Sequence, residues 1–261
     1  MKIVVGIKQV PDTTDVRINP ETNTLIREGV ESIINPFDLY AIEEAVRLKE
    51  AHGGEVTVIS MGPPQVESAL REAISLGADR AVHLCDRAFA GADTWATSYA
   101  LARGIRKIGD YDLVICGKQA IDGDTAQVGP GIAVGLDIPQ LTYVKKIEEA
   151  GEGKIRVQRM TEEGYQVLEG DLPCLLTVVK EINEPRLPSL KGKMKAKKAE
   201  IVVWTAEDIE AEPELIGLDG SPTQVVKIFS PPPREGGEIL QGDPEEITDR
   251  LVSALEKNKI I

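Results

Sequence analysis

The first half of the chain alternates between short apolar runs and segments whose apolar residues recur at helical spacing. The apolar runs, rich in Val and Ile, occupy 3–7, 56–60, 80–84 and 112–116. Continuous runs of this length are typical of parallel strands that are buried on both faces. The helical segments occupy 35–52, 66–76 and 93–108, and a fourth begins near Thr125 and stops around Gly135. This alternation predicts an α/β fold: a mostly parallel sheet with helices on both faces and right-handed crossovers.

Residues at the ends of these helical segments support the assignment. Asn35 comes directly before Pro36, which fits an N-cap followed by proline at the first helical position. Gly53, Gly77 and Gly109 fall where a helix commonly ends in a left-handed residue.

The pattern changes after Asp137. Residues 140–179 contain short strand-like runs, with turns at 150–153 and 162–164 and a last break at 170–173. These runs are too few and too short for a core of their own. We therefore expect them to extend the same sheet as an antiparallel part.

The C-terminal third carries Lys- and Pro-rich segments without a clear apolar pattern. Within 180–261 only 244–258 has helical spacing of apolar residues. A segment this long and this polar is expected to form an extended arm that lies across a partner.

Composition excludes several classes of function. The net charge of −13 and the pI near 4.8 argue against nucleic-acid binding, which needs a basic surface. No apolar run approaches the roughly 18 residues that cross a membrane, and the N-terminal sequence lacks the pattern of a signal peptide, so we expect a cytoplasmic protein. Three scattered cysteines and two histidines predict no metal site and no catalytic triad. Any redox chemistry must come from a bound cofactor.

Four loops are expected at one edge of the sheet. They cover 6–12, 35–38, 60–64 and 117–127. Because ligands of open α/β sheets bind beyond the carboxyl ends of the strands, these loops predict a nucleotide site. Neither GxGxxG nor GxxxxGK[ST] is present, so the sequence supports neither standard Rossmann nor Walker binding.

The loop 117–127 is long for a connection from strand to helix, which favours binding. Its glycines, Gly117 and Gly123, allow close approach of the backbone, and the amides at a helix start near Thr125 can hold a phosphate. Lys118, Thr125 and Gln127 add donors. Asp122 and Asp124 stay ambiguous, since one could cap the helix and the other bind a ribose.

Several of these features also have a purely structural explanation. Spacing alone favours Asn35 as a simple helix cap, and Met61 serves equally as a ring contact or as core filling. The lysine cluster at 191–198 would ordinarily be a solvated face, and the acidic pair Glu43-Glu44 is expected to be solvated on a helix surface.

The sequence resembles the electron transfer flavoprotein beta-subunit family along nearly its whole length. The resemblance rests on VVGIKQVPD at 4–12, NPFDLYAIEEAVRLKE at 35–50, VISMGPPQ at 58–65, REAISLGADRAVHL at 71–84, DLVICGKQAIDGDTAQVGP at 112–130, NEPRLPSLKGKMKAKK at 183–198 and GSPTQVV at 220–226. It implies a Rossmann-like fold of the adenine-nucleotide alpha-hydrolase type that pairs with a larger, FAD-binding alpha subunit.

The resemblance also implies a set of nucleotide contacts. These are Gly6, Asn35, Pro36, Phe37, Asp38, Met61, Gly117, Lys118, Gln119, Ala120, Ile121, Asp122, Gly123, Asp124, Thr125, Ala126, Gln127 and Val128. In respiratory members this site holds a structural AMP. In electron-bifurcating members it holds a second FAD, which accepts electrons from NADH and passes them on through the alpha-subunit FAD.

The lysine-rich segment is similar to the family's recognition loop for a partner of the acyl-CoA dehydrogenase type. The expected anchor is Leu190, surrounded by Lys191, Lys193, Lys195, Lys197 and Lys198. The expected division is a nucleotide- or flavin-binding domain at 1–185, a recognition loop at 186–200 and an arm at 201–261 that packs on the alpha subunit.

The choice between AMP and FAD depends on 122–130, which reads DGDTAQVGP. This resembles the bifurcating type, whereas respiratory members usually carry a stretch similar to DDDxNQTG. Gly123 leaves room and removes a negative charge beside a pyrophosphate, which favours FAD over AMP. An alternative of another class is a homodimeric ATP-binding regulator similar to universal stress proteins.

Overall fold

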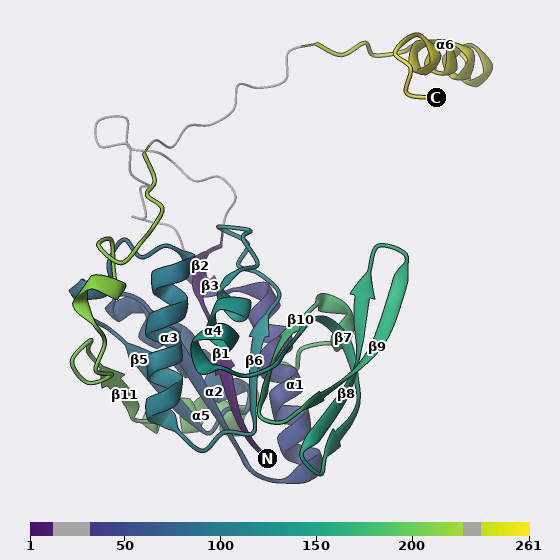
Figure 1. Cartoon of the computed structure of the whole chain (residues 1–261). Helices are drawn as coiled ribbons and strands as arrows, with labels where there is room; N and C mark the ends of the chain where they lie inside the picture. The colour runs from purple at the N-terminus through teal and green to yellow at the C-terminus, as the bar shows by residue number, and fades with distance from the viewer. Residues whose placement is uncertain (13–31, 227–235) are drawn as a thin grey trace. The chain divides into compact units, whose positions relative to one another are not determined.

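A nine-stranded sheet runs through residues Met1–Val226 of the computed structural model, which describes residues 1–12, 32–226 and 236–261 (Figure 1). The strand order is β11-β5-β4-β1-β6-β10-β7-β8-β9. In chain order the strands are β1 Lys2–Gly6, β4 Glu55–Met61, β5 Arg80–Leu84, β6 Leu113–Gly117, β7 Gln140–Gly151, β8 Lys154–Thr161, β9 Gly164–Asp171, β10 Cys174–Val178 and β11 Ile201–Trp204. Pairing is parallel from β11 to β7, and β8 and β9 follow as antiparallel hairpins. The predicted α/β class is confirmed.

Helices cover both faces of the sheet, as predicted (Figure 1). Their bounds are α1 Pro36–His52, α2 Glu67–Leu76, α3 Thr94–Ile108, α4 Val128–Leu136 and α5 Leu190–Lys198. One apolar core lies under α1, α2 and α5 and includes Ile42 and Ile74, both fully buried. The other lies under α3 and α4 and includes Ile105 and Ile132.

The chain reverses its course across the sheet beside β1. From β1 it moves outward through β4 to β5, and α3 then carries it over the opposite face to β6, on the other side of β1. Gly6 at the end of β1 pairs with Cys116 at the end of β6. In open α/β sheets, ligands bind at the carboxyl ends of the two strands where such a reversal occurs, because the following loops turn away to opposite faces.

The segment 140–179 is only partly antiparallel, which corrects the expectation. β10 lies between β6 and β7 and is parallel to both. All five of its residues are buried, the burial pattern of an interior parallel strand. The turns predicted before β10 separate β7, β8 and β9 correctly. They do not predict where in the sheet the next strand lies.

The segment after residue 185 also differs from the expectation. Residues 190–198 form α5, and β11 pairs in parallel with β5 at the sheet edge. Ile209 and Ile216 are buried in the core under α3. The sequence-based boundary at 185 therefore divides residues that form one compact unit, Met1–Val226.

Lys227–Ile261 form the second unit, of which residues 236–261 are described. The helix predicted at 244–258 is present as α6, Pro244–Lys257. Asp243 caps it by accepting hydrogen bonds from the amides of Glu245 and Glu246, at 3.1 and 3.0 Å. Among the residues described in both units, no helix is long and apolar enough to cross a membrane.

Candidate functional site at the switch point

The predicted loops meet at the carboxyl edge of the sheet, where the chain reverses its course. β1 ends at Gly6 and β6 at Gly117, and the first turn of α1 packs directly against Gly117. A short antiparallel pair adds to this rim, formed by β2, Gln9–Pro11, and β3, Ser32–Ile34. We call the loops 6–12, 35–38, 60–64 and 117–127, together with β2 and β3, the switch-point rim.

Asn35 connects two of the loops across the rim. Its side chain is 1% exposed and does not cap α1, although Pro36 follows as expected. Instead its Nδ2 donates to the carbonyl oxygen of Gln119 at 2.9 Å, and its Oδ1 accepts from the amide of Ile121 at 3.1 Å. The interpretation of Asn35 as a simple cap is therefore wrong, because the backbone of the 117–127 loop takes both of its polar atoms.

Asp38 makes a second connection beneath the rim. Its Oδ2 accepts from the amide of Lys8 at 2.8 Å and its Oδ1 from the amide of Gly117 at 3.2 Å. Burial raises the pKa of this carboxyl to about 7, although the amide hydrogen bonds act in the opposite direction. A Cβ on Gly117 would lie 2.4 Å from Asp38 Oδ1, so this glycine gives room to α1 rather than to a ligand.

The two ambiguous acids of the loop have partners within the protein. Asp122 accepts from Lys8 Nζ at 2.7 Å, and Asp124 accepts from the side chain of Gln119. Neither of them caps a helix. Asp124 and Ala126 have left-handed backbone, with φ of 55° and 53°. Left-handed backbone at non-glycine residues is uncommon and concentrates at ligand sites and turns.

α4 begins three residues later than expected. Its first residue is Val128 instead of a residue near Thr125, and Gln127 precedes it without a side-chain cap. The helix start that could hold a phosphate therefore presents the amides of Val128 and Gly129. Gln127 turns toward α3, where its Oε1 accepts from Thr94 Oγ1 at 3.1 Å.

The other predicted contacts lie around this edge. Gly6 faces the Cys116 thiol, whose Sγ would be 3.0 Å from an added Cβ, and Met61 is half-buried against the core at the end of β4. Burial raises the pKa of Cys116 to about 12, so this thiol stays protonated and is no nucleophile at neutral pH. Ile121, Asp122, Gly123, Asp124, Thr125 and Gln127 are exposed.

Two neighbours of the rim were not predicted from the sequence, Tyr143 on β7 and Thr177 on β10. The amide of Tyr143 donates to Thr177 Oγ1 at 3.1 Å, and the tyrosine ring lies beside Lys118. Both residues lie in strands whose place beside β6 could not be read from the turn pattern.

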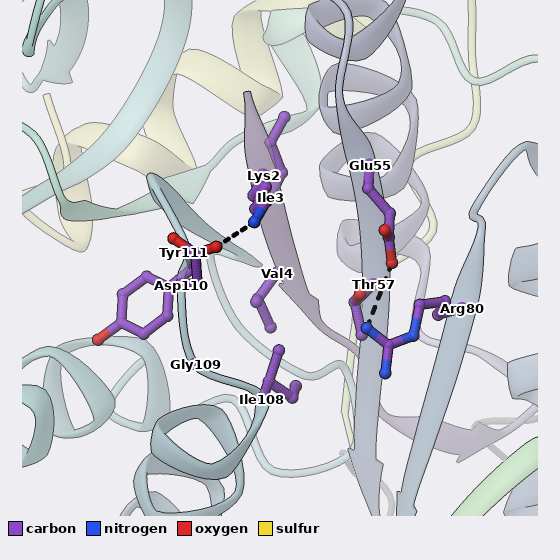
Figure 2. Close-up of a pocket in the computed structure, with 10 residues that line it drawn as sticks. All are labelled: Lys2, Ile3, Val4, Glu55, Thr57, Arg80, Ile108, Gly109, Asp110 and Tyr111. Carbon is purple, nitrogen blue, oxygen red and sulfur yellow. Dashed lines mark hydrogen bonds and ion pairs between the residues drawn. The ribbon is translucent and has the colours of Figure 1, made fainter.

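A cavity of about 170 Å³ lies at the opposite, amino edge of the sheet (Figure 2). Two ion pairs border it, Lys2 with Asp110 and Arg80 with Glu55, and Thr57 lies beside the second pair (Figure 2). Its cations are already matched by acids of the same chain, and nucleotides of this fold class bind at the carboxyl edge. The cavity is therefore no candidate for the nucleotide site.

The predicted recognition segment forms a helix on the outside of α2. Arg71 donates to the carbonyl oxygens of Ala196 and Ala199, and Gly192 lies so close to Ser75 that a Cβ would be 2.2 Å from its carbonyl oxygen. Leu190 is 78% exposed and Met194 is 56% exposed, one helical turn apart. Together they line an open groove with Lys191, Lys195 and Lys198.

The predicted lysines do not all have the same environment. Lys195 donates to the carbonyl oxygen of Ala78 at 2.9 Å and pairs with Asp79 at 3.3 Å, so it fastens α5 to the domain. Lys191, Lys193, Lys197 and Lys198 are exposed.

A strap at residues 183–189 leads into α5 and is bound to α1. Arg186 Nε pairs with Glu43 Oε2 at 2.7 Å, and Arg47 pairs with Glu43 Oε1 at 2.5 Å. Glu43 is only 4% exposed, so the expectation of a solvated acid is wrong there. Hydrogen bonds from the two arginines lower the pKa of Glu43 against the effect of its burial. Glu44 accepts from the side chain of Asn183 at 3.0 Å.

Fold and rim together define a doubly wound α/β protein whose candidate ligand site lies at a topological switch point. The model of the electron transfer flavoprotein domain matches residues 22–209. The chain is 56% identical over the whole of both chains to the electron transfer flavoprotein subunit beta of Thermoanaerobacterium thermosaccharolyticum.

Two further relatives are similarly close. The chain is 52% identical, again over the whole of both chains, to the caffeyl-CoA reductase-Etf complex subunit CarD of Acetobacterium woodii. It is 53% identical to protein FixA of Azorhizobium caulinodans, over 99% of this chain and 95% of that one. The chain belongs to the electron transfer flavoprotein beta-subunit family, and the alternative of a stress-protein-like regulator is set aside.

Proposed function

We propose that this chain is the beta subunit of a heterodimeric electron carrier and holds an adenine-containing cofactor at the switch-point rim. The observation that carries this proposal is the way Asn35 and Asp38 fix the 117–127 loop beside the start of α4. Their hydrogen bonds keep a backbone surface ordered, and an ordered surface reduces the entropic cost of binding a ligand.

The rim has the properties that a nucleotide needs. Gly123 has no atom within 4 Å of where a Cβ would lie, so the outer side of the loop is open. The start of α4 offers uncapped amides, and Lys118 adds a positive charge. Asp122 and Asp124 are negative beside this surface; the Lys8 ammonium offsets the charge of Asp122, and a hydrogen bond from the Gln119 amide group holds Asp124 in place.

We favour FAD over AMP as the cofactor. DGDTAQVGP at 122–130 resembles bifurcating members of the family, and one relative is a subunit of a complex named caffeyl-CoA reductase-Etf. A bound FAD would supply transfer of electrons from NADH, through the FAD of an alpha subunit, to an acyl-CoA dehydrogenase-type partner. Cys116 is protonated, and Asp38 and Asn35 are engaged with the backbone, so the redox chemistry would belong to the cofactor and the rim would bind and orient it.

The groove on α5 is the proposed docking site for the partner dehydrogenase. Leu190 and Met194 form its apolar centre, and Lys191 and Lys198 form a basic border. An apolar anchor supplies burial on contact, and surrounding charges speed the encounter. We further propose that the segment 236–261, with α6, packs on the alpha subunit.

Flavin analysis of the purified heterodimer tests the cofactor assignment. The chain is co-expressed with its alpha subunit, and FAD and AMP are released by denaturation and counted. Two FAD per heterodimer, together with reduction by NADH, is the expected result. One FAD plus one AMP would replace the bifurcating assignment with the respiratory one, and a beta subunit without any nucleotide would contradict the site itself.

A further inference from the structure

His83 is a buried polar residue in the interior of the sheet. It lies on β5, is 2% exposed, and pairs in register with Ser60 of β4 on one side and with Val203 of β11 on the other. A buried imidazole destabilises a fold unless it is hydrogen-bonded, whereas an apolar side chain would carry no such cost. A histidine at this position therefore needs a hydrogen-bond partner.

That partner is the backbone of the loop that follows β4. His83 Nε2 lies 2.9 Å from the carbonyl oxygen of Gly62. Because a carbonyl oxygen only accepts, Nε2 carries the proton of the neutral imidazole, and burial favours this neutral form by lowering the pKa of His83. The amide of Gly62 donates to the carbonyl oxygen of Leu84 at 3.0 Å. The end of β5 thus holds both backbone polar groups of Gly62.

The other side of this loop is also fixed. A Cβ on Gly62 would lie 2.7 Å from Val66 Cγ2, so the short helix η1, Pro64–Val66, packs directly against the Gly62 peptide. The side chain of Gln9 on β2 donates to the carbonyl oxygen of Gln65 at 3.2 Å. The loop is therefore bound from β5, from η1 and from β2.

We propose that His83 is a positioning residue for nucleotide binding, which holds Met61 and the Gly62 peptide at the switch-point rim through its Nε2–H. Met61 is the predicted nucleotide contact on this loop, and it directly precedes the peptide that β5 holds. A loop that is fixed before the ligand arrives reduces the entropic cost of binding. This inference rests on the proposed nucleotide site and adds to it a buried residue of β5 that acts through the loop.

Two substitutions that differ in reach test this role. Gln carries its amide donor as many bonds from Cβ as the Nε2 of histidine, whereas the donor of Asn is one bond closer to the backbone. Titration calorimetry measures AMP and FAD binding to the heterodimer freed of the nucleotide that this chain binds. We expect His83→Gln to stay within about twofold of the unaltered protein and His83→Asn to bind about fivefold or more weakly.

Val82→Ala is the control for general stability. Val82 is the neighbouring residue on β5, 0% exposed, and belongs to the core under α3 and α4. Its side chain points away from that of His83, because successive side chains of a strand alternate between the two faces. We expect a lower melting temperature, by about 2–8 °C, and affinities within about twofold. If Val82→Ala weakened binding as much as His83→Asn, the positioning role would be refuted.

A double-mutant cycle with Met61→Ala shows whether His83 acts through the loop. Once Met61 is replaced, His83→Asn should weaken binding by less than about twofold more, because the contact that it positions is gone. An effect of His83→Asn that persisted in full, or equal binding by the Asn and Gln variants, would contradict the proposal while nucleotide binding itself stood. If the unaltered heterodimer bound neither AMP nor FAD, the proposed function would fail first.

Discussion

The side chain of Asn35 donates a hydrogen bond to the carbonyl oxygen of Gln119 across the switch point, 84 residues further along the chain. With the bond from the Ile121 amide, this contact fixes the inner half of the 117–127 loop. Asn35→Ala would leave a carbonyl and an amide without their partner. We expect a loss of about 1–3 kcal/mol in the free energy of unfolding and at least fivefold weaker AMP or FAD binding.

Asn183→Ala is the control for that substitution. Asn183 Nδ2 also donates to a backbone carbonyl, that of Tyr40, but on the strap and away from the rim. Urea denaturation should show a loss of stability for both variants, and calorimetry should show weakened nucleotide binding for Asn35→Ala alone. Equal effects of the two on binding would mean that Asn35 acts only through general stability.

The buried carboxyl of Asp38 should make stability depend on pH. Its pKa of about 7 in the folded protein lies above the ordinary value of 3.8, chiefly because burial disfavours the charged form. The folded state then binds the proton more tightly than the unfolded state. The stabilisation from this group is full below pH 3.8 and declines as the pH rises, by about 1.4 kcal/mol per unit, until it levels off above about 7.

Asp38→Asn removes this titration and leaves the other acids in place. The difference in the free energy of unfolding between the unaltered protein and the variant isolates the contribution of Asp38. From pH 5 to 7 the unaltered protein should lose stability relative to Asp38→Asn, and from pH 7 to 9 the difference should stay constant. A difference that does not change with pH would show that the Asp38 pKa is not raised.

The alternation of strands and helices could be predicted because each element has its own local pattern. β1, β4, β5 and β6 are mostly buried on both faces, and glycines with positive φ follow α1, α2 and α3 at Gly53, Gly77 and Gly109. β11 and the buried Ile209 and Ile216 could not be found in this way, since their burial depends on long-range packing against β5 and α3.

The placement of the candidate loops at one edge of the sheet could be predicted from topology, but the directions of their side chains could not. Asn35 has the sequence context of a helix cap, and only the fold reveals that its amide reaches Gln119 and Ile121 instead. The position of Tyr143 depends on a register shift between β7 and β10. Such a shift is a property of the two strands once paired, and the residues of one strand alone do not predict it.

Arg186 should contribute more to stability than an exposed arginine does. It pairs with Glu43, which is buried, and with Glu50 at 2.7 Å. Arg186→Met would leave Glu43 with Arg47 and the backbone amide of residue 186, so we expect a loss of about 1–3 kcal/mol in the free energy of unfolding. Arg80→Met is the control, because both members of its pair with Glu55 are exposed, and its loss should be below about 1 kcal/mol. Equal losses in urea denaturation would contradict the role of the strap.

Leu190 should affect partner docking without affecting stability. Leu190→Ala shortens the exposed anchor of the α5 groove, and Leu187→Ala removes an even more exposed leucine outside it. Neither should change the melting temperature by more than about 1 °C. We expect Leu190→Ala alone to lower the rate of electron transfer to an acyl-CoA dehydrogenase, about fivefold or more. A rate unchanged in stopped-flow measurements would remove Leu190 as the anchor.

Shortened chains test whether the compact unit extends to residue 226. A chain that ends at Val226 keeps β11 and the buried side chains of Ile209 and Ile216, and it should melt as cooperatively as the full chain. A chain that ends at Glu200 leaves β5 as an exposed edge and uncovers the core under α3. Loss of each buried isoleucine costs about 2–5 kcal/mol, against a total stability of about 5–15 kcal/mol. We therefore expect this chain to be degraded in limited proteolysis.

A pair of substitutions in the full-length chain separates this effect from chain length. Ile209→Ala opens the core under α3 and should cost about 2–5 kcal/mol. Ile239→Ala alters an exposed isoleucine of the second unit and should cost less than about 0.5 kcal/mol. If the chain ending at Glu200 resisted protease as well as the one ending at Val226, and Ile209→Ala cost nothing, then residues 201–226 would be an arm after all. Their apolar side chains would then pack against a partner subunit instead of against the sheet of their own domain.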